Sequence, residues 1–570
     1  MTSSRFLRTT VAVLALAGAA CSSSTPITST STGGSGGGGK SGEGGTTGSG
    51  GVGGTGGTTS SGGQPGSGGR TGSGGATGSG GQPGTGGATS SGGQPGSGGR
   101  SSPGDASASD VAVGGRSGSG GRSGLGDANA AGGAGPSTGG TTVTGSGGST
   151  AIYVGTKTPG TAPAGAITVD PTKTHQVVDG FGLADVWQGS SSAAMQTLLW
   201  DPVNGIGLNL LRIGIESASG KSVLMGNAAI ADGQACKKFS GDACKVWAAP
   251  WSPPASMKGN NNVNGNSTNA CSATATSRLN TSSYDAWSTM LAGFPATYKA
   301  QSGIDLYALS AQNEPDWNPN YEACCFTSAE MVNFINVLGP KLAALSPPVN
   351  LLAAEPDNWS NFWSGDNYAT AILADAKASA NVTILATHDY GGTSAGTYGR
   401  PAPPANNTHH IWETECTPNP TDALTIATMV YAAFSTGGVN GWHYWWTQSF
   451  IPNASSPPAQ YYALGNFSKF VHAGYYRVDV SGAAKASGTV PLVVAFSDLS
   501  DGTVSIVVVN GGSAQQVSLF VAGTAWPASV TPYVTTASSK LAAGTAIPVT
   551  AGAFSASLEA QSVTTFVGKP

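Results

Sequence analysis

Two segments of the sequence place a glutamate where a buried run of residues stops. Residues 307–317 read YALSAQNEPDW, so an apolar run ends at Glu314-Pro315. Proline cannot donate to a strand ladder and biases the residue before it away from helix, which puts Glu314 at the rim of a strand. A second run, HIWETE, ends at Glu415. Two carboxylates that face each other can hydrolyse a glycoside: one protonates the leaving oxygen, and the other attacks the anomeric carbon or activates water.

Both glutamates have an alternative interpretation. Glu314 at a strand end could instead cap the following helix, which is a structural role. On the second strand, side-chain alternation predicts that Glu413 and Glu415 point to the same side, with Glu415 nearer the end that faces the active mouth. Glu413 is therefore the alternative nucleophile.

The elements that must position these glutamates extend over residues 165–470. Strand-like apolar runs alternate there with helical patterns, and eight runs is the number that closes a parallel barrel. The runs lie at 177–181, 208–215, 246–249, 305–311, 349–354, 382–386, 410–412 and 439–444, and helical patterns lie at 284–298, 328–345 and 367–378. Residues 179–182 are expected to form a turn.

An open doubly wound sheet would show a similar alternation. A nucleotide-binding sheet of that kind would carry a Gly-rich phosphate loop after an early strand, and no G-x-G-x-x-G or Walker pattern follows one here. Polar and aromatic residues instead gather at the C-terminal ends of the runs, as at the catalytic face of a barrel: Arg212, Trp251, Asn313, Glu314, His388, Tyr390, Glu415 and Trp445. The sequence therefore predicts an α/β protein built on a (β/α)8 TIM barrel.

A second β-rich region follows the barrel. After Phe470 the helical period disappears, and short β-rich runs separated by Gly, Asp and Ser predict a β-sandwich side domain over residues 471–570. Strands within residues 152–178 precede the barrel and are expected to complete this sandwich. A free-standing carbohydrate-binding module is the alternative, but no long linker separates this region from the barrel, which favours a packed side domain.

The N-terminal quarter of the chain predicts export. Residues 1–21 have the layout of a bacterial export signal, with two arginines before a short apolar run. Small residues before Cys21 resemble a lipoprotein cleavage site, which predicts a lipid anchor at Cys21, and an ordinary signal-peptidase site at Ala17–Ala19 is the alternative. Residues 22–150 are rich in Gly, Ser and Thr, with SGGQPG repeats that lack apolar positions, so we expect a disordered tether. The protein is therefore expected outside the cell or on its surface.

Composition excludes several function classes. Only 9% of the 570 residues are charged and the formal net charge is -4, which provides neither a basic face for nucleic acid nor a polybasic patch for a membrane. Apart from Cys21, six cysteines remain, and an even number in an exported chain predicts disulfides, with Cys236 and Cys244 as the first pair. No Cys-x-x-Cys pair or His cluster has zinc spacing, so we expect neither a metal nor another cofactor.

Several motifs together resemble glycoside hydrolase family 30. They are GFG from Gly180, LLRIGI from Leu210, APWSPPASMK from Ala249, ALSAQNEPDW from Ala308, WETE from Trp412 and YYALGNFSKFVHAGYYRV from Tyr461. NEP alone occurs in many barrel glycosidases, whereas the combination is much narrower, and it covers the chain from about Ile167 onward. The resemblance implies a (β/α)8 barrel, a β-sandwich built from both ends of the chain, and hydrolysis of β-glycosides with retention of configuration.

Carried over by position, the resemblance implies Glu314 as the acid/base and Glu415 as the nucleophile. Asn313 would hold the sugar 2-hydroxyl, and Arg212 would orient the nucleophile and keep it ionised. Tyr390 looks like the family's hydroxyl that steadies Glu415.

Aromatic and histidine residues near the predicted strand ends are further candidates. Tryptophans after the third, fourth and eighth predicted strands favour a stacking floor for sugar rings, with burial in the core as the alternative for each: Trp251, Trp317, Trp445 and Trp446. His388 is either a substrate contact or a hydrogen-bonded structural histidine, and His443 is expected to pack in the core.

The sequence departs from the family pattern at one place that bears on the substrate. Family members specific for glucuronoxylan usually carry an arginine just beyond the strand-eight Trp pair, where it binds the glucuronic acid carboxylate, but TQSF follows Trp446 here. Unless Arg400 or another loop residue takes the place of the missing arginine, we expect cleavage of the β-1,4-xylan backbone with relaxed demand for side chains. We also expect a monomer. Family relatives acting on β-1,6-galactan, β-1,6-glucan or glucosylceramide are the alternative. A non-catalytic surface glycan-binding protein and a structural cell-surface protein are the alternatives from other classes.

Overall fold

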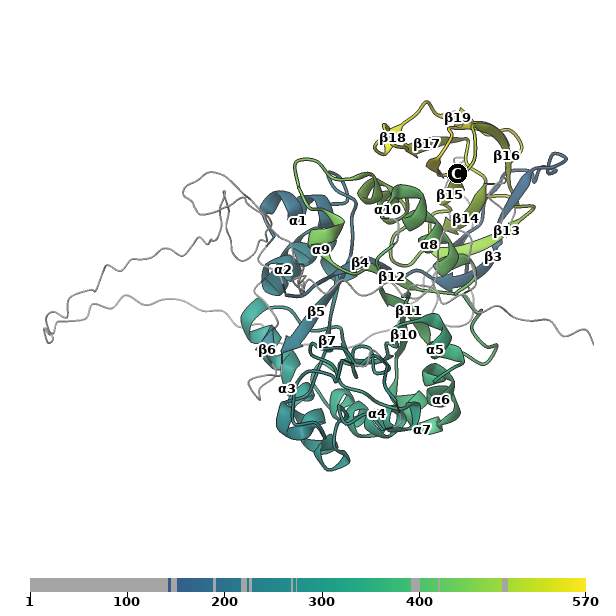
Figure 1. Cartoon of the computed structure of the whole chain (residues 1–570). Helices are drawn as coiled ribbons and strands as arrows, with labels where there is room; N and C mark the ends of the chain where they lie inside the picture. Colours follow the sequence, from purple (N-terminus) through teal and green to yellow (C-terminus); the bar gives the residue numbers. More distant parts are fainter. Residues whose placement is uncertain are drawn as a thin grey trace, which may run out of the picture. The chain divides into compact units, whose positions relative to one another are not determined.

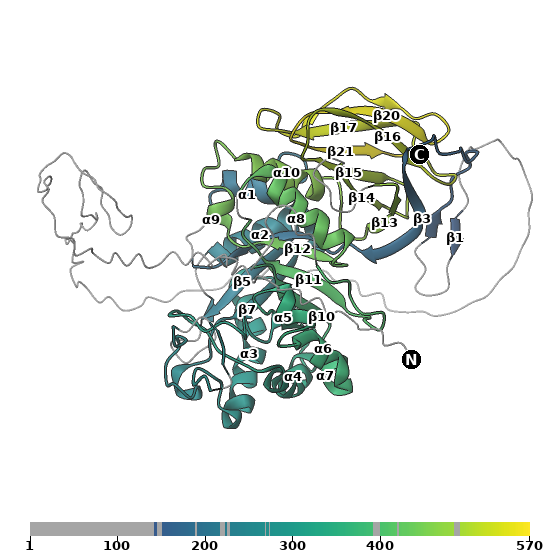
Figure 2. The ribbon, with the colours of Figure 1, turned by 45° about the vertical axis from the view of Figure 1, so that its right-hand side comes forward.

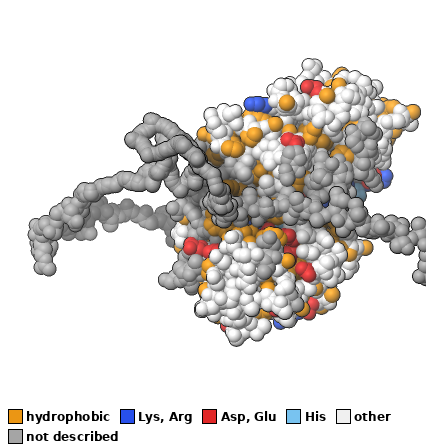
Figure 3. All heavy atoms as spheres, viewed as in Figure 1, with side chains coloured by type: hydrophobic (Ala, Val, Ile, Leu, Met, Phe, Trp, Pro, Cys, Tyr) orange, Lys and Arg blue, Asp and Glu red, His pale blue; other side chains and the backbone are white. Residues whose placement is uncertain are grey.

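The computed structural model describes residues 142–144 and 151–570, apart from 188–190, 217–222, 225–227, 268–269, 273, 391–399, 419–420 and 484–490. The predicted export signal, Cys21 and nearly all of the tether lie outside the described residues. Within the described residues, no helix is both long and apolar enough to cross a bilayer. Lys and Arg side chains are few on the face drawn in Figure 3, in keeping with the low content of charged residues.

Eight parallel strands form a closed barrel, which confirms the predicted fold class (Figure 1). In chain order they are β4 (Gly180–Asp185), β5 (Leu210–Glu216), β7 (Lys245–Pro250), β8 (Ala308–Ser310), β9 (Asn350–Ala354), β10 (Ile384–His388), β11 (His410–Glu415) and β12 (Gly441–Tyr444). Each strand pairs in parallel with the next, and β12 pairs with β4 to close the ring. The carboxyl ends of all eight strands therefore meet at one mouth.

Helices cover the outside of the barrel (Figures 1 and 2). They are α1 (Ala193–Trp200), α2 (Ala228–Ser240), α3 (Tyr284–Ser302), α4 (Ser328–Ala343), α5 (Trp359–Trp363), α6 (Tyr368–Ala374), α7 (Ala376–Asn381), α8 (Ala423–Ser435), α9 (Thr447–Phe450) and α10 (Ala459–Ser468). A capping box between Thr327 and Glu330 starts α4, since each side chain accepts a hydrogen bond from the other residue's backbone N–H. The pattern predicted as one helix over 367–378 is two helices, because Asp375 ends α6 and caps the N-terminus of α7.

The first barrel strand occupies the segment that was expected to turn, so that prediction is wrong. Residues Gly180–Asp185 form β4, with every residue buried. The glycines serve close packing against β5 here: a Cβ on Gly182 would lie 2.1 Å from the carbonyl oxygen of Leu210, and one on Gly180 would lie 1.9 Å from Asn209 Oδ1. The two glycines suggested a turn in the sequence, but in the fold they allow β4 to lie close to its neighbour.

Ten further strands form one curled sheet beside the barrel (Figure 2). They are β3 (Ile167–Val177), β13 (Tyr476–Ser481), β14 (Leu492–Ser497), β15 (Val504–Asn510), β16 (Gln515–Val521), β17 (Ser529–Thr535), β18 (Ala542–Ala543), β19 (Ile547–Pro548), β20 (Ala553–Leu558) and β21 (Ser562–Gly568). The sheet folds over its own core, since the ring centroids of Phe554 on β20 and Phe566 on β21 lie 5.4 Å apart. The predicted side domain is confirmed as a single curled sheet, into which β3 brings the segment that precedes the barrel.

This sheet packs against the barrel helices. The rings of Phe434 on α8 and Phe496 on β14 lie 5.5 Å apart within one continuous core. Asn466 on α10 donates a hydrogen bond of 2.9 Å to the carbonyl oxygen of Tyr533 on β17. These buried contacts join the two regions into one unit. Short pairs β1 (Thr142–Thr144) with β2 (Ala151–Tyr153), and β5 with β6 (Val223–Leu224), complete the strands.

Four of the six cysteines outside the N-terminal segment form disulfides. The expected Cys236–Cys244 bond is confirmed, and Cys271 bonds to Cys325. Cys324 and Cys416 are buried thiols. The prediction that an even number of cysteines means that all of them form disulfides is therefore wrong for these two. Each thiol is buried in the core, apart from the other.

Candidate active site

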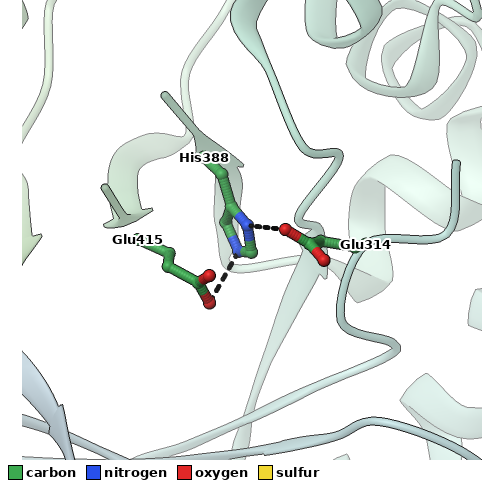
Figure 4. Close-up of side chains that lie close together, drawn as sticks. All are labelled: Glu314, His388 and Glu415. Atoms are coloured by element: carbon green, nitrogen blue, oxygen red, sulfur yellow. Dashed lines mark hydrogen bonds and ion pairs between the residues drawn. The ribbon is translucent and has the colours of Figure 1, made fainter. Parts of the chain in front are cut away.

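Glu314 and Glu415 meet at the mouth of the barrel, although 101 positions separate them in the sequence. Glu314 follows β8 and Glu415 ends β11, and both side chains are almost fully buried. One carboxylate oxygen of each lies within 4.8 Å of the other and of a nitrogen of His388. Figure 4 shows His388 between the two glutamates, with its ring nitrogens directed at both. The barrel therefore brings together the two carboxylates that the sequence singled out.

Arg212, which projects from β5, ties the nucleophile candidate to the barrel. Its guanidinium forms ion pairs with Glu415 and, at 3.0 Å, with Glu355. A terminal nitrogen of the same guanidinium also donates a hydrogen bond to Asn313 Oδ1. Because arginine only donates, this bond makes Oδ1 the acceptor and turns the amide NH2 of Asn313 away from Arg212. Arg212 is thus placed to orient Glu415, as the family resemblance implied, and it also holds Asn313.

Sequence reasoning missed Glu355, which follows β9. Its carboxylate is wholly buried and accepts hydrogen bonds from Arg212 and Ser310. His388 Nε2 lies 3.4 Å from Glu355 Oε1, and His388 Nδ1 lies 3.2 Å from Glu314 Oε1. A signal was present, because Glu355 begins Glu-Pro-Asp, the same triplet that Glu314 begins.

The burial and charges of this cluster separate its protonation states. Burial raises the pKa of Glu314 to about 7, with the charge of Glu415 adding to the rise and the hydrogen bond with His388 opposing it. Burial alone would also raise the pKa of Glu355, but the charge of Arg212 and the hydrogen bond with His388 lower it to about 2. Burial would lower the pKa of His388, yet the charge of Glu415 and hydrogen bonds with Glu314 and Glu355 raise it to about 10. Glu314 therefore retains a proton near neutral pH, as a general acid requires.

A β-bulge decides which glutamate of β11 reaches this cluster. Glu413 pairs with Thr387 of β10 and Glu415 pairs with His388, so Thr414 is an extra residue without a partner. A bulge re-aims the side chains that follow it. The prediction that Glu413 and Glu415 share one side is therefore wrong.

Glu413 lies in the barrel wall, away from the cluster. Its carboxylate accepts hydrogen bonds from the indoles of Trp359 and Trp442, at 3.0 and 2.6 Å, and from Arg400 Nε at 2.9 Å. Arg400 is itself buried and also contacts Asp389. Neither Glu413 nor Arg400 faces the Glu314–Glu415 pair.

Tyr390 lies beside the pair, beyond the end of β10. Its hydroxyl donates a hydrogen bond of 2.7 Å to Glu415 Oε1, and Arg212 bonds the other oxygen, Oε2. Burial, with the charge of Glu415, raises the pKa of Tyr390 well above its usual value, so the phenol stays protonated. Glu415 thus has one donor on each oxygen, which fixes its orientation.

Tryptophans line the mouth next to the carboxylates. The ring centroids of Trp251 and Trp445 lie 6.2 Å apart, and the guanidinium carbon of Arg212 lies 4.8 Å from the Trp251 ring. Trp187, which the sequence reading did not single out, contacts both rings at 5.0 and 6.2 Å and is 39% exposed. Trp446 is half-buried and donates to the carbonyl oxygen of Val186.

Trp317 and the histidines differ in their surroundings. Trp317, two residues after Pro315, is half-buried. His388 is a fully buried, hydrogen-bonded histidine between the two carboxylates. His443 is buried between Trp247 Nε1, at 3.0 Å, and the carbonyl oxygen of Glu413, which agrees with the expected packing role.

The spacing of Glu314, His388 and Glu415 would also suit a metal ion. His388, however, already contacts a carboxylate through each ring nitrogen, at 3.2 and 3.4 Å, which leaves neither nitrogen free for a metal. The donor set therefore does not fit metal ligation.

A buried acid paired with a glutamate that accepts a hydrogen bond on each oxygen, beside aromatic walls at the mouth of a (β/α)8 barrel, defines a glycoside hydrolase. Residues 229–409 match the model of the glycosyl hydrolase family 30 TIM-barrel domain. A GH30 endoxylanase from Clostridium papyrosolvens C71 is 30% identical, with a TM-score of 0.58 over 71% of this chain and 100% of that structure. The chain belongs to glycoside hydrolase family 30, as its motifs had indicated.

Two further relatives are similar over the same region. Glucuronoxylanase XynC of Bacillus subtilis strain 168 is 29% identical over 423 residues, which are 71% of this chain and 92% of that protein. The GH30 subfamily 8 xylanase Xyn30A from Clostridium acetobutylicum is 28% identical, with a TM-score of 0.59 over 71% of this chain and 100% of that structure.

Proposed function

We propose that this glycoside hydrolase is an endo-β-1,4-xylanase that retains anomeric configuration, with Glu415 as nucleophile and Glu314 as acid/base. The separation of the two carboxylates carries the proposal. Retaining enzymes hold their carboxyl groups about 5 to 5.5 Å apart, whereas inverting enzymes need about 6.5 to 9.5 Å to admit a water. The contact within 4.8 Å between Glu314 and Glu415 supports the first class.

The reaction follows from the protonation states. Glu314 donates its proton to the glycosidic oxygen while Glu415 attacks the anomeric carbon, so the leaving sugar departs and a glycosyl ester forms on Glu415. Glu314, now ionised, removes a proton from water, which attacks the same carbon and frees Glu415. Arg212 and Tyr390 hold the nucleophile in line, and the amide NH2 of Asn313 is free to reach the sugar 2-hydroxyl.

The proposed substrate is the xylan backbone with relaxed demand for side chains. Xylanase relatives over the same region support xylan. The residues after Trp446 form α9, and Thr447 Oγ1 bonds the carbonyl oxygen of Ala184. Arg400 is not available to bind a glucuronic acid carboxylate, since Glu413 and Asp389 already engage it. The tryptophans at the mouth, with Trp187 added, would stack on sugar rings.

One set of assays tests this function. Purified protein is incubated with glucuronoxylan, arabinoxylan, β-1,6-glucan and β-1,6-galactan, and product lengths and anomeric configuration are measured. We expect oligosaccharides of mixed length from both xylans, first released as the β-anomer. Products that all carry glucuronate at one fixed position would contradict relaxed demand, and release from a β-1,6-glycan alone would assign a different substrate. A glycan-binding protein would bind without turnover.

The matched variants assign the two roles. Glu314→Gln and Glu415→Gln should each lower kcat/KM by about 10²-fold or more, because each removes an acid/base or a nucleophile. Glu413→Gln should retain a larger share of activity, because Glu413 lies in the wall. Full activity of Glu415→Gln would refute the assignment.

Export is a separate proposal. Residues 1–21 would direct secretion, residues 22–150 would act as a tether, and Cys21 would carry the lipid, which leaves residues 165–470 and 471–570 as a catalytic head outside the cell. Cells fed an alkyne-tagged fatty acid should label the wild type but not Cys21→Ser. Cleavage after Ala19 would instead leave Cys21 as the second residue of the mature chain, without a lipid, and give an unlabelled, secreted head.

A further inference from the structure

Two consecutive barrel strands, β8 and β9, are followed by the same triplet. Residues 314–316 and 355–357 both read Glu-Pro-Asp. Glu314 and Glu355 both have positive φ, at 42° and 60°, a region that non-glycine residues seldom occupy. Such conformations persist only where surrounding contacts hold them. The two turns therefore need something to hold them, and each carries a glutamate of the active-site cluster.

Backbone hydrogen bonds connect the two turns to the rest of the site. The N–H of Glu314 donates to the carbonyl oxygen of Glu355 at 3.0 Å. The N–H of Tyr390 donates to the carbonyl oxygen of Asp357, also at 3.0 Å, and the Tyr390 hydroxyl bonds Glu415. A displacement of the second turn would thus reach both the acid and the nucleophile candidates.

Asp316 joins the turns through its side chain. Its carboxylate is buried and accepts from the N–H of Asp357 at 3.0 and 3.2 Å. It also accepts from Asn361 Nδ2 on α5 at 2.8 Å. Asp316, which lies two residues after Glu314 in the turn that follows β8, therefore fastens the turn that follows β9.

The side chain of Asp357 completes this contact. Burial, followed by the charge of Asp316 and a hydrogen bond with it, raises the pKa of Asp357 to about 9. Asn358 Nδ2 donates to Asp357 Oδ1, which leaves Oδ2 to carry the proton. At neutral pH the protonated carboxyl can donate to the Asp316 carboxylate, which already bonds the backbone N–H of Asp357, whereas two ionised carboxylates there would repel each other.

We propose that Asp316 and Asp357 share one proton and thereby latch the two Glu-Pro-Asp turns, which makes both aspartates positioning residues for Glu314 and Tyr390. The proposal rests on the roles proposed above for Glu314 and Glu415. Asp316 and Asp357, which lie outside the Glu314–Glu415 pair, would then keep the acid and the nucleophile correctly placed relative to each other.

Other charged groups face this latch. Glu314 precedes it on the same turn, His388 faces it from β10, and Asp366 and Tyr368 face it from the start of α6. Arg278 acts on Asp366 from the loop before α3. Of these groups only Glu314 is altered below, and there both of the proteins that are compared carry Glu314→Gln, so the groups are a constant background in each comparison.

Substitutions of Asp357 distinguish a role of its hydrogen bond with Asp316 from a role in packing alone. Asparagine keeps an acceptor for Asn358 and a donor for Asp316, so Asp357→Asn should retain kcat within about threefold. Asp357→Ala removes the donor and should lower kcat by about tenfold or more with KM nearly unchanged, since small misplacements of catalytic groups cost this much. Asp305→Asn, at the opposite end of the β8 segment and half exposed, is the matched control and should behave as wild type. Equal losses in Asp357→Asn and Asp357→Ala would overturn the latch.

Replacement of Asp316 gives a readout that a purely structural role would not move. The negative charge of Asp316 contributes to the raised pKa of Glu314. In Asp316→Asn, the basic limb of the kcat/KM profile should therefore shift to lower pH while kcat falls. An unmoved basic limb together with unchanged kcat would contradict the proposal.

Stability measurements test the shared proton without catalysis. The folded-state pKa of Asp357 lies above its unfolded value, so this group stabilises the fold at low pH and the contribution is lost as pH rises to about 9. In the Glu314→Gln background, the free energy of unfolding should decline from pH 4 to 9 relative to the same protein carrying Asp357→Asn. Parallel curves would refute the shared proton, and if Glu314→Gln itself stayed active, the proposed function would fail while this arm still reported on the latch.

Discussion

Replacing Glu415 with glutamine removes a negative charge that acts on the Glu314 carboxyl group. The two side chains have similar shapes: Arg212 can still donate to the amide oxygen, and the hydroxyl of Tyr390 can accept from the amide NH2. We expect the pKa of Glu314 to fall from about 7 toward its ordinary value, because the charge of Glu415 is one of the causes that raise it. The same loss of charge occurs during the proposed reaction, when Glu415 becomes an ester.

The magnitude follows from the separation of the carboxylates. Two unit charges about 5 Å apart, at an effective dielectric constant of about 20, interact by about 3 kcal/mol. Since 1.36 kcal/mol corresponds to one pKa unit, the expected fall is about 2 units. A fall of this size would convert Glu314 from an acid into a base within one catalytic cycle, as the second step requires.

The assay is a carbon-13 NMR titration of the glutamate side-chain carboxyls in wild type and Glu415→Gln, with the Glu314 signal assigned from Glu314→Gln. Glu413→Gln is the matched control, since it makes the same substitution on the same strand but in the barrel wall, away from the Glu314–Glu415 pair. We expect Glu413→Gln to move the pKa of Glu314 by a much smaller amount. A pKa that stays near 7 in Glu415→Gln would show that burial alone sets it, and the argument from charge would be wrong.

Two further predictions concern the nucleophile and the barrel base. Tyr390→Phe should lower kcat/KM by about 10-fold or more in a protein that still folds, because Glu415 loses the donor on Oε1 that orients it; unchanged kinetics would contradict the role of the hydroxyl. Asp179, at the opposite end of the barrel, bonds Lys245, His410 and Trp412. Burial alone would raise the pKa of Asp179, but its bond with His410 and the charge of Lys245 lower it. Asp179→Asn should therefore cost about 3 kcal/mol in urea unfolding at pH 7. The difference should shrink as pH falls below about 4, because the unfolded chain then binds a proton that the folded protein, with its lowered pKa, does not yet bind; a constant difference would refute this.

The sequence was sufficient for features that depend on local order along the chain. Glu314 before a proline at the end of an apolar run, and Glu415 at the end of another, already indicated a carboxylate pair. The alternation of apolar runs and helical patterns predicted the barrel, because strands and helices can each be recognised from the spacing of apolar residues along the chain. The short spacing of Cys236 and Cys244 similarly sufficed for one disulfide.

Only the tertiary structure decided how those residues work together. Alternation along β11 placed Glu413 and Glu415 on one side, and the extra residue at Thr414 reversed this, since a bulge is defined by the partner strand. Glu355 and His388 acquire their roles from strands that meet only when the barrel closes. The protonation of Glu314 depends on burial and on charges carried by residues distant in sequence, and no local pattern records either quantity.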